Sequence, residues 1–176
     1  GKIIKPISED DLDRLISQLT TLEVEAVAIS FLNAYLNPVH ENYVVKVMSE
    51  CLPHVFVTAA SELSREWFEY ERTSTAVANA YVGPKTCGYV NRFDEILAAE
   101  EFPGLFYTMG SNGGVLSPKL TMEQPIALVE SGPIGGCVGA SVYANHLGVE
   151  RLIAFDMGGT TAKCALVEGA LSEVQD

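Results

Sequence analysis

Apolar and polar residues alternate along the N-terminal part of the chain in patterns typical of an α/β domain. Within 8–22, apolar residues recur every three or four positions behind Ser8, which predicts a capped amphipathic helix. The segment 24–31 (VEAVAISF) is β-branched and almost continuously apolar, as in a strand buried on both faces of a sheet. A second helix is expected over 38–50 and a second strand over 55–59. This order of elements favours an α/β architecture.

A longer helical pattern follows over 72–100. Gly83 and Pro84 are expected to divide it into two helices, because proline lacks the N–H group that a helix interior needs. The stretch suits either a connector between two α/β parts or a helix that covers one sheet, and the pattern favours neither.

Glycine dominates the chain after residue 103, since twelve of the fifteen glycines lie between 104 and 169. The pattern there predicts short strands separated by glycine-rich turns, and one helix. The expected ranges are strands at 105–109, 151–155, 162–167 and 171–174, a loop at 110–114, a helix at 131–147 and a turn at 156–161.

The composition is acidic, with 11 basic and 23 acidic residues and a formal net charge of -12. Nucleic acids and anionic membrane surfaces require basic faces, so neither is expected as a partner. No apolar run reaches the ~18 residues of a membrane span. The four cysteines form no CxxC pair, so buried free thiols in a cytoplasmic protein are expected. A nucleotide site remains compatible with this charge, because backbone amides and a metal ion can hold phosphates.

The sharpest chemical pattern is FDMGGTT at 155–161, where a strand leads through Asp156 into two glycines and two threonines. An aspartate at a strand end can hold Mg²⁺ directly or through water. Gly158 and Gly159 allow unusual backbone conformations and can bring main-chain amides close to phosphate oxygens. A plain β-hairpin with a Gly-Gly turn accounts for the same residues equally well.

Two further glycine-rich segments accompany this pattern. SGPIGG at 131–136 suits the N-terminus of a helix that receives an anion, although an ordinary capped and closely packed helix start explains it too. SNGG at 111–114 follows a strand, where α/β folds place ligand contacts, although a turn that needs positive φ is a sufficient explanation. Three such segments so close in sequence are harder to attribute to packing alone.

Seven motifs match one known family in sequence order: AVAISFL at 26–32, LNPVHE at 36–41, EYERTST at 69–75, NAYV at 79–82, SNGG at 111–114, SGPIGG at 131–136 and FDMGGT at 155–160. On these motifs the chain resembles the hydantoinase/oxoprolinase family, and within it the ATP-dependent hydantoinase A-type subunit of N-methylhydantoinase-like proteins. The resemblance covers essentially the whole chain. It implies an α/β fold of the actin-like ATPase (ribonuclease-H-like) type.

The resemblance also implies how the chain is divided, and we expect an internal fragment with a partial fold. Residues 1–72 are expected to be the C-terminal part of the first ribonuclease-H-like half and 73–103 the connecting helices. Residues 104–176 are expected to begin the second half, with its phosphate-binding hairpin. Family members carry an earlier Asp-Gly-Gly-Thr hairpin that is absent here, so the isolated fragment is expected to be inactive.

The resemblance implies ATP-dependent opening of a hydantoin or 5-oxoproline-type ring through a phosphorylated amide, with Mg²⁺ and a hydantoinase B-type partner subunit or domain. Asp156 is the expected catalytic and metal-binding residue. The expected phosphate contacts are Gly158, Gly159, Thr160, Thr161, Ser131, Gly132, Gly135 and Gly136, and the expected substrate contacts are Ser111, Asn112 and Gly113. Two alternatives remain: the ATPase subunit of an acetone- or acetophenone-type carboxylase, and a non-catalytic actin-like scaffold.

One position departs from the family pattern. Many members carry an acid where this chain has Lys163, so a metal-associated carboxylate is missing there. A lysine at this position either places a cation near phosphate or points outward from the return strand into solvent, and the sequence favours neither.

Overall fold

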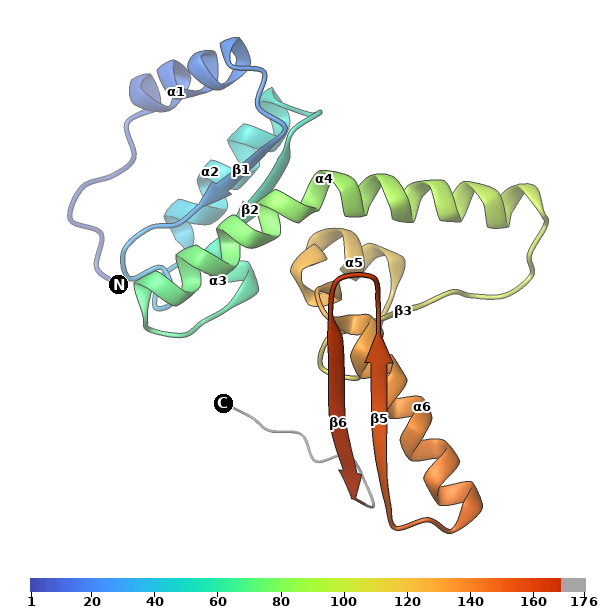
Figure 1. The fold of residues 1–176 in the computed structure, drawn as a ribbon. Coiled ribbons are helices and arrows are strands. Elements are labelled where there is room, and N and C mark those ends of the chain that lie inside the picture. Colours follow the sequence, from blue (N-terminus) through green and yellow to red (C-terminus); the bar gives the residue numbers. More distant parts are fainter. Residues whose placement is uncertain (169–176) are drawn as a thin grey trace. The chain divides into compact units, whose positions relative to one another are not determined.

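The computed structural model describes residues 1–168, which form two compact units (Figure 1). The N-terminal unit consists of Gly1–Phe102 and Met122–Ile126. The C-terminal unit consists of Pro103–Thr121 and of Ala127–Asp176, described as far as Glu168. The assignment of 1–72, 73–103 and 104–176 to parts of a larger nucleotide-binding fold stays a prediction.

The N-terminal unit contains α1 (Glu9–Thr21), β1 (Ala26–Ile29), α2 (Val39–Cys51), β2 (Phe56–Ala59), α3 (Ala60–Leu63) and α4 (Glu69–Ala99). This order agrees with the prediction, except that the short helix α3 was not predicted. The hydroxyl of Ser8 accepts a hydrogen bond from the N–H group of Asp11 at 3.3 Å, which confirms the predicted cap of α1. Strands β1 and β2 are parallel, with Ala26 opposite Phe56 and Ile29 opposite Ala59.

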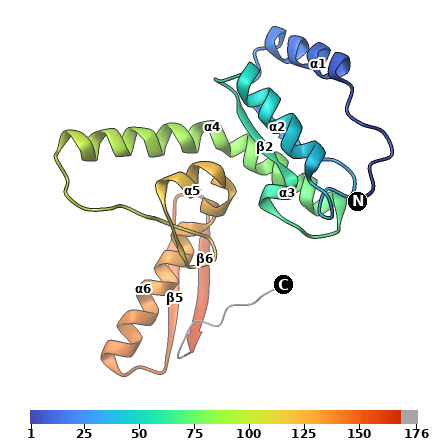
Figure 2. The same ribbon diagram turned by 180° about the vertical axis from the view of Figure 1, so that it is seen from behind.

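The core of this unit lies between the β1–β2 pair and the helices α1 and α2. Its buried members are Leu12, Ile29, Val44, Met48 and Ala59. Thr58 points to the opposite face of the sheet, because side chains alternate along a strand. There its hydroxyl meets Asn79 of α4, so α4 covers the second face. Figure 2 shows the same elements from behind.

Helix α4 corrects the prediction of two helices separated at Gly83 and Pro84. It runs without interruption from Glu69 to Ala99 and contains Pro84. Figure 1 shows the helix bending near its middle, as a proline inside a helix causes. A Cβ atom added at Gly83 would lie 2.5 Å from the ring of Phe56, so the helix backbone packs directly on β2. This packing holds the helix together where local propensity alone predicts a break.

Asn79 joins α4 to the later segment Met122–Ile126. Its side-chain Nδ2 donates to the hydroxyl of Thr58 at 3.0 Å and to the carbonyl oxygen of Glu123 at 3.3 Å. Its Oδ1 accepts a hydrogen bond from the N–H group of Ile126 at 2.9 Å. Because Asn79 is fully buried, these bonds fix that segment as part of the N-terminal unit.

The C-terminal unit contains a small hairpin of β3 (Thr108–Met109) and β4 (Val115–Leu116), and a longer hairpin of β5 (Arg151–Met157) and β6 (Ala162–Glu168). The helix α6 (Ser131–Leu147) packs on the longer hairpin. Two short helices, α5 (Pro118–Glu123) and η1 (Pro125–Leu128), precede α6.

Most of the predicted elements in this unit are confirmed. Helix α6 ends at Gly148, which adopts φ 67°, the left-handed conformation that suits a glycine cap. The strand predicted over 105–109 is shorter than expected, because its partner β4 offers only two residues. The strand predicted over 171–174 lies outside the described residues.

The four cysteines are free, as expected, but they are not all buried. Cys51 and Cys164 are exposed, and Cys87 and Cys137 are half-buried, so the expectation of four buried thiols was wrong. Burial raises the pKa of the Cys87 thiol, which keeps it protonated and unreactive.

Candidate functional site

Two of the three glycine-rich segments meet at the start of α6. A Cβ atom added at Gly113, in the β3–β4 loop, would lie 3.7 Å from the side chain of Ile134. Gly113 also adopts φ 83°, which favours glycine. A Cβ atom added at Gly135 would lie 3.6 Å from Met109 of β3. The β3–β4 loop and the first turns of α6 therefore pack together, which the sequence could not show.

The β3–β4 loop is closed by its own hydrogen bonds. The N–H group of Gly110 donates to the carbonyl of Gly114 at 2.8 Å, and the Oδ1 of Asn112 accepts from the N–H group of Gly114 at 3.0 Å. The N–H group of Ser111 donates to the carbonyl of Ala127 at 2.7 Å. These bonds give Ser111 and Asn112 a local structural role, and their role as ligand contacts stays a prediction.

The glycine-rich segment 131–136 lies inside α6 rather than ahead of it. Ser131 is the first helical residue, and the N-cap is Glu130, whose side chain caps no backbone N–H group. The helix covers the predicted residues 131–147, but the alternative of an ordinary serine cap is not found, because the chain enters the helix through a left-handed residue, Glu130, at φ 65°. No atom lies within 4 Å of a Cβ added at Gly132 or Gly136, so this side of the first two turns is open.

The β5–β6 hairpin carries the Asp-Met-Gly-Gly-Thr-Thr motif. Asp156 is the penultimate residue of β5, and the turn is closed by the N–H group of Gly158, which donates to the carbonyl of Thr161 at 2.9 Å. Neither Gly158 nor Gly159 has positive φ, so the turn does not need the conformational freedom of glycine at these positions. Instead they leave space: nothing lies within 4 Å of a Cβ added at Gly159. A ligand can thus approach the main chain closely.

A cavity of about 420 Å³ lies between α6 and the β5–β6 hairpin. Its walls come from Glu130, Pro133, Ile134, Gly136, Cys137 and Ala140 on the helix side and from Ala154, Phe155, Asp156, Lys163, Cys164 and Ala165 on the hairpin. The lining is mainly apolar, with three charged residues. The structure therefore brings Asp156 and Gly136 to one cavity, while 111–113 and 158–161 are not part of its walls.

Lys163 supplies a cation to the lining of this cavity, and its side chain is partly exposed to solvent. It lies directly opposite Asp156 in the strand register, so both side chains leave the same face of the hairpin. Its Nζ donates to a carboxylate oxygen of Glu130. Within residues 1–168 the carboxylate of Asp156 has no ion-pair partner.

These residues fit a Mg²⁺–phosphate group. Among the described residues no cluster of three or more metal-ligating side chains occurs, so Asp156 would be a lone protein ligand. Mg²⁺ suits such a position, because it keeps several waters and takes further oxygens from substrate phosphates. The open glycine backbone beside Asp156 leaves space for those phosphates.

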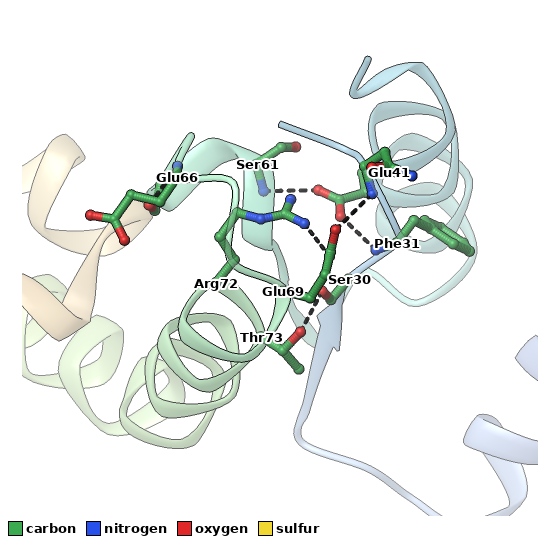
Figure 3. A network of polar contacts seen from close by, with 10 residues as sticks. Ser30, Phe31, Glu41, Ser61, Glu66, Glu69, Arg72 and Thr73 are labelled. Atoms are coloured by element: carbon green, nitrogen blue, oxygen red, sulfur yellow. Dashed lines mark hydrogen bonds and ion pairs between the residues drawn. The ribbon is translucent and has the colours of Figure 1, made fainter. Parts of the chain in front are cut away.

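A second polar cluster, in the N-terminal unit, was missed by sequence reasoning (Figure 3). Glu41 of α2 is fully buried, and its carboxylate accepts hydrogen bonds from the N–H group of Phe31 at 2.7 Å and that of Ser61 at 2.8 Å. These groups follow the carboxyl ends of β1 and β2, so Glu41 ties the two strands together. The sequence pattern contained a sign of this buried carboxylate. Glu41, Val44 and Met48 are spaced to share one helix face, so an acidic residue occupies a core position.

Arg72 extends this cluster from the first turn of α4. It is fully buried, pairs with Glu69, and holds its guanidinium 5.4 Å from the ring centroid of Tyr35. Glu69 also accepts a hydrogen bond from the N–H group of Asn33 at 2.9 Å. Burial raises the pKa of the nearby Glu62 carboxyl, and repulsion from Glu41 adds to the rise. The cluster fastens α4 to the sheet and concentrates negative charge there.

The described residues contain no helix that is both long and apolar enough to cross a membrane.

The sequence matches models of two regions of one protein family. Residues 72–175 match "Hydantoinase/oxoprolinase", and residues 1–52 match "Hydantoinase/oxoprolinase N-terminal region". An uncharacterized protein of Methanocaldococcus jannaschii is 38% identical over 95% of this chain and 25% of its own length. The caprolactamase subunit alpha of Pseudomonas jessenii is 33% identical over 96% of this chain and 24% of its own length. The acetophenone carboxylase gamma subunit of Aromatoleum aromaticum is 28% identical over 95% of this chain and 23% of its own length.

Two solved structures share the fold. A nucleotide-free acetone carboxylase superposes with a TM-score of 0.82 at 25% identity, over 96% of this chain and 24% of that chain. The ATP-dependent caprolactamase of Pseudomonas jessenii superposes with a TM-score of 0.81 at 31% identity, over 94% of this chain and 24% of that chain. This confirms the predicted fold class, a partial α/β ATPase fold. The chain spans about a quarter of the length of these relatives.

Proposed function

Because the chain belongs to the hydantoinase/oxoprolinase family, we propose that the protein containing it uses ATP to open a cyclic amide of the hydantoin or 5-oxoproline type. Both solved relatives are ATP-dependent, one a caprolactamase and the other an acetone carboxylase. ATP-dependent chemistry on a cyclic amide or in carboxylation is therefore the broad function of such relatives. The amide substrate is our narrower proposal.

The observation that carries the proposal is the end of the β5–β6 hairpin. Asp156, whose carboxylate has no ion-pair partner in the described part of the chain, lies beside a turn whose glycines leave open space. We assign Asp156 to Mg²⁺ or to its bound water, and the main-chain amides of Gly159, Thr160 and Thr161 to the phosphates. Gly158, whose own N–H group donates to the carbonyl of Thr161, is assigned to the close approach of the phosphates to the main chain. The first turn of α6 offers N–H groups that no helical carbonyl pairs, so Ser131 and Gly132 suit an anion as well.

The chemistry follows from the stability of amides. An amide carbonyl resists water because nitrogen donates electrons to it. Transfer of the terminal phosphoryl group of ATP to the amide oxygen releases ADP and makes the carbon electrophilic. Water then adds to that carbon, and the ring C–N bond breaks as nitrogen takes a proton, which leaves an acyl phosphate. A second water hydrolyses the acyl phosphate to a carboxylate and inorganic phosphate. The protein contributes positioning and charge neutralisation, which dominate phosphoryl transfer. Ser111, Asn112 and Gly113 are the residues we propose beside the substrate.

A second candidate is the ATPase subunit of a carboxylase, in which the phosphorylated group is an enolised ketone. The acetone carboxylase superposition and the cation Lys163 at the cavity favour it. The relatives are named as subunits, so we also propose a partner subunit of the hydantoinase B type. Phosphate release by the full-length protein with hydantoins, 5-oxoproline or aryl ketones separates the candidates. Stimulation by ketones alone would replace the amide proposal, and bound nucleotide without stimulation would favour a scaffold.

Asp156→Asn in the full-length protein tests the site itself. The variant keeps the size of the side chain but loses the charge that holds Mg²⁺, so ATP turnover is expected to fall at least about a hundredfold. Asp94→Asn, at an exposed position of α4, is the matched control and should keep full turnover. Turnover by Asp156→Asn within a few-fold of the parent protein would contradict the assigned role.

A further inference from the structure

The position of Lys163 gives it a specific relation to the predicted phosphate site. It lies opposite Asp156 across the hairpin and shares with it the cavity beside α6. Arg151, the other basic residue of the described hairpin, pairs with Glu168 at the opposite end, with 3.3 Å between Nε and Oε1. Lys163 is thus the hairpin cation next to the motif that the proposed function assigns to phosphate.

The partner of Lys163 is an internal anion at the start of a helix. The Glu130 carboxylate receives the Lys163 ammonium directly before the first turn of α6, where backbone N–H groups favour negative charge. Glu130 also holds φ 65°, a left-handed conformation that is unfavourable for a non-glycine residue. The Glu130 carboxylate accepts from the lysine that a phosphate group would use, and it leaves the N–H groups of the helix N-terminus unbound.

The pair is exposed enough to exchange partners. The side chain of Lys163 is 37% exposed and that of Glu130 is 60% exposed. Ion pairs in such surroundings contribute little to stability, because water screens both charges. A doubly charged phosphate that enters the cavity mouth therefore competes with Glu130 for Lys163 at small cost.

We propose that Lys163 positions the phosphate group of the nucleotide and that Glu130 is a built-in competitor, which holds Lys163 in place until phosphate displaces it. This inference rests on the proposed function, because it takes the ligand to be a phosphate. It settles the two readings of Lys163 in favour of a cation directed at the site.

Substitutions of Lys163 and of Glu130 are expected to change ligand affinity in opposite directions, whereas an ion pair with only a structural role would not give this result. Lys163→Met keeps the stem but removes the charge, so the full-length protein should bind ADP and inorganic phosphate about tenfold more weakly. Glu130→Gln removes the competitor, so both ligands should bind several-fold more tightly. The double variant should match Lys163→Met, because without the lysine there is nothing to compete for.

The experiment is titration calorimetry of the full-length protein with ADP and with inorganic phosphate, at low and high salt. Arg151→Met and Glu168→Gln break the ion pair at the far end of the same two strands and should leave both affinities unchanged. Raising the salt concentration should weaken binding to the parent protein more than binding to Lys163→Met.

The outcomes separate this inference from the proposed function. If the parent protein binds ADP and Lys163→Met binds it equally well, the inference is wrong and the proposed function stands. If Lys163→Met and Glu130→Gln both weaken binding, Glu130 supports the lysine and does not compete, which overturns the competitor role. If the parent protein binds neither ligand, the proposed function itself fails.

Discussion

The two units differ in where they keep their charged and apolar groups. The N-terminal unit buries Glu41 and Arg72 completely and gives both of them partners inside the protein. The C-terminal unit keeps Asp156 and Glu130 exposed. On the outer face of its hairpin, apolar side chains are between 64% and 71% exposed, namely Ile153, Phe155, Met157 and Leu166.

The difference indicates a division of labour. In the N-terminal unit, the buried charged side chains connect helices to strands, so removing them should lower the free energy of unfolding. In the C-terminal unit, a carboxylate, a cation and an open glycine backbone are left available, so their removal should change ligand affinity and leave the fold intact. Mutations can therefore break or sharpen the comparison.

The largest effect on stability is expected from Glu41→Ala. The change leaves the buried N–H group of Ser61 and the part-buried N–H group of Phe31 without an acceptor, and a buried orphan group costs about 1–3 kcal/mol. The free energy of unfolding should fall by on the order of 3 kcal/mol in urea denaturation. Glu50→Ala, at an exposed position of the same helix, is the control and should stay within about 0.5 kcal/mol. A loss below about 1 kcal/mol for Glu41→Ala would end the contrast between the units.

Alanine substitutions at two helical glycines are expected to change stability by an intermediate amount and in opposite directions. Gly83→Ala places a methyl group 2.5 Å from the Phe56 ring, and such overpacking costs about 1–3 kcal/mol, partly offset by better helix propensity. Gly139→Ala in α6 meets nothing within 4 Å, so propensity alone should stabilise that helix by up to about 1 kcal/mol. Thermal unfolding of both variants measures the difference. Equal shifts would mean that α4 does not pack on β2 as described.

The smallest effect concerns Glu62 and depends on pH. Burial is the main cause that raises the pKa of this carboxyl, and repulsion from Glu41 and Glu123 raises it further. A hydrogen bond with the Ala59 backbone lowers the pKa in part. The stability that Glu62 contributes is present below its unfolded pKa of about 4.3 and is lost as pH rises through the higher folded pKa. Glu62→Gln should therefore gain less than about 1 kcal/mol at pH 7 and nothing near pH 3. Urea denaturation of the parent protein and of Glu62→Gln at both pH values measures the difference.

Local patterns were enough to predict most elements but not their contacts. The capped α1, the alternating strands and helices and the glycine end of α6 all follow from neighbouring residues. The unbroken α4 does not, because Gly83 and Pro84 weaken a helix locally while Phe56, far away in sequence, supports it. The same holds for Lys163. Its alternation along β6 leaves the direction open, and only the placement of α6 puts Glu130 within reach.

The hydrogen bonds of Asn79 have a consequence for how the protein is made. The N-terminal unit takes Met122–Ile126 from beyond the first part of the C-terminal unit, so it is discontinuous in sequence. On the ribosome, its buried Asn79 lacks the partners Glu123 and Ile126 until those residues have left the exit tunnel. The first unit to be synthesised is therefore not complete at residue 102. A gene cut between the two units at that point would remove a segment that the N-terminal unit needs for its own interior.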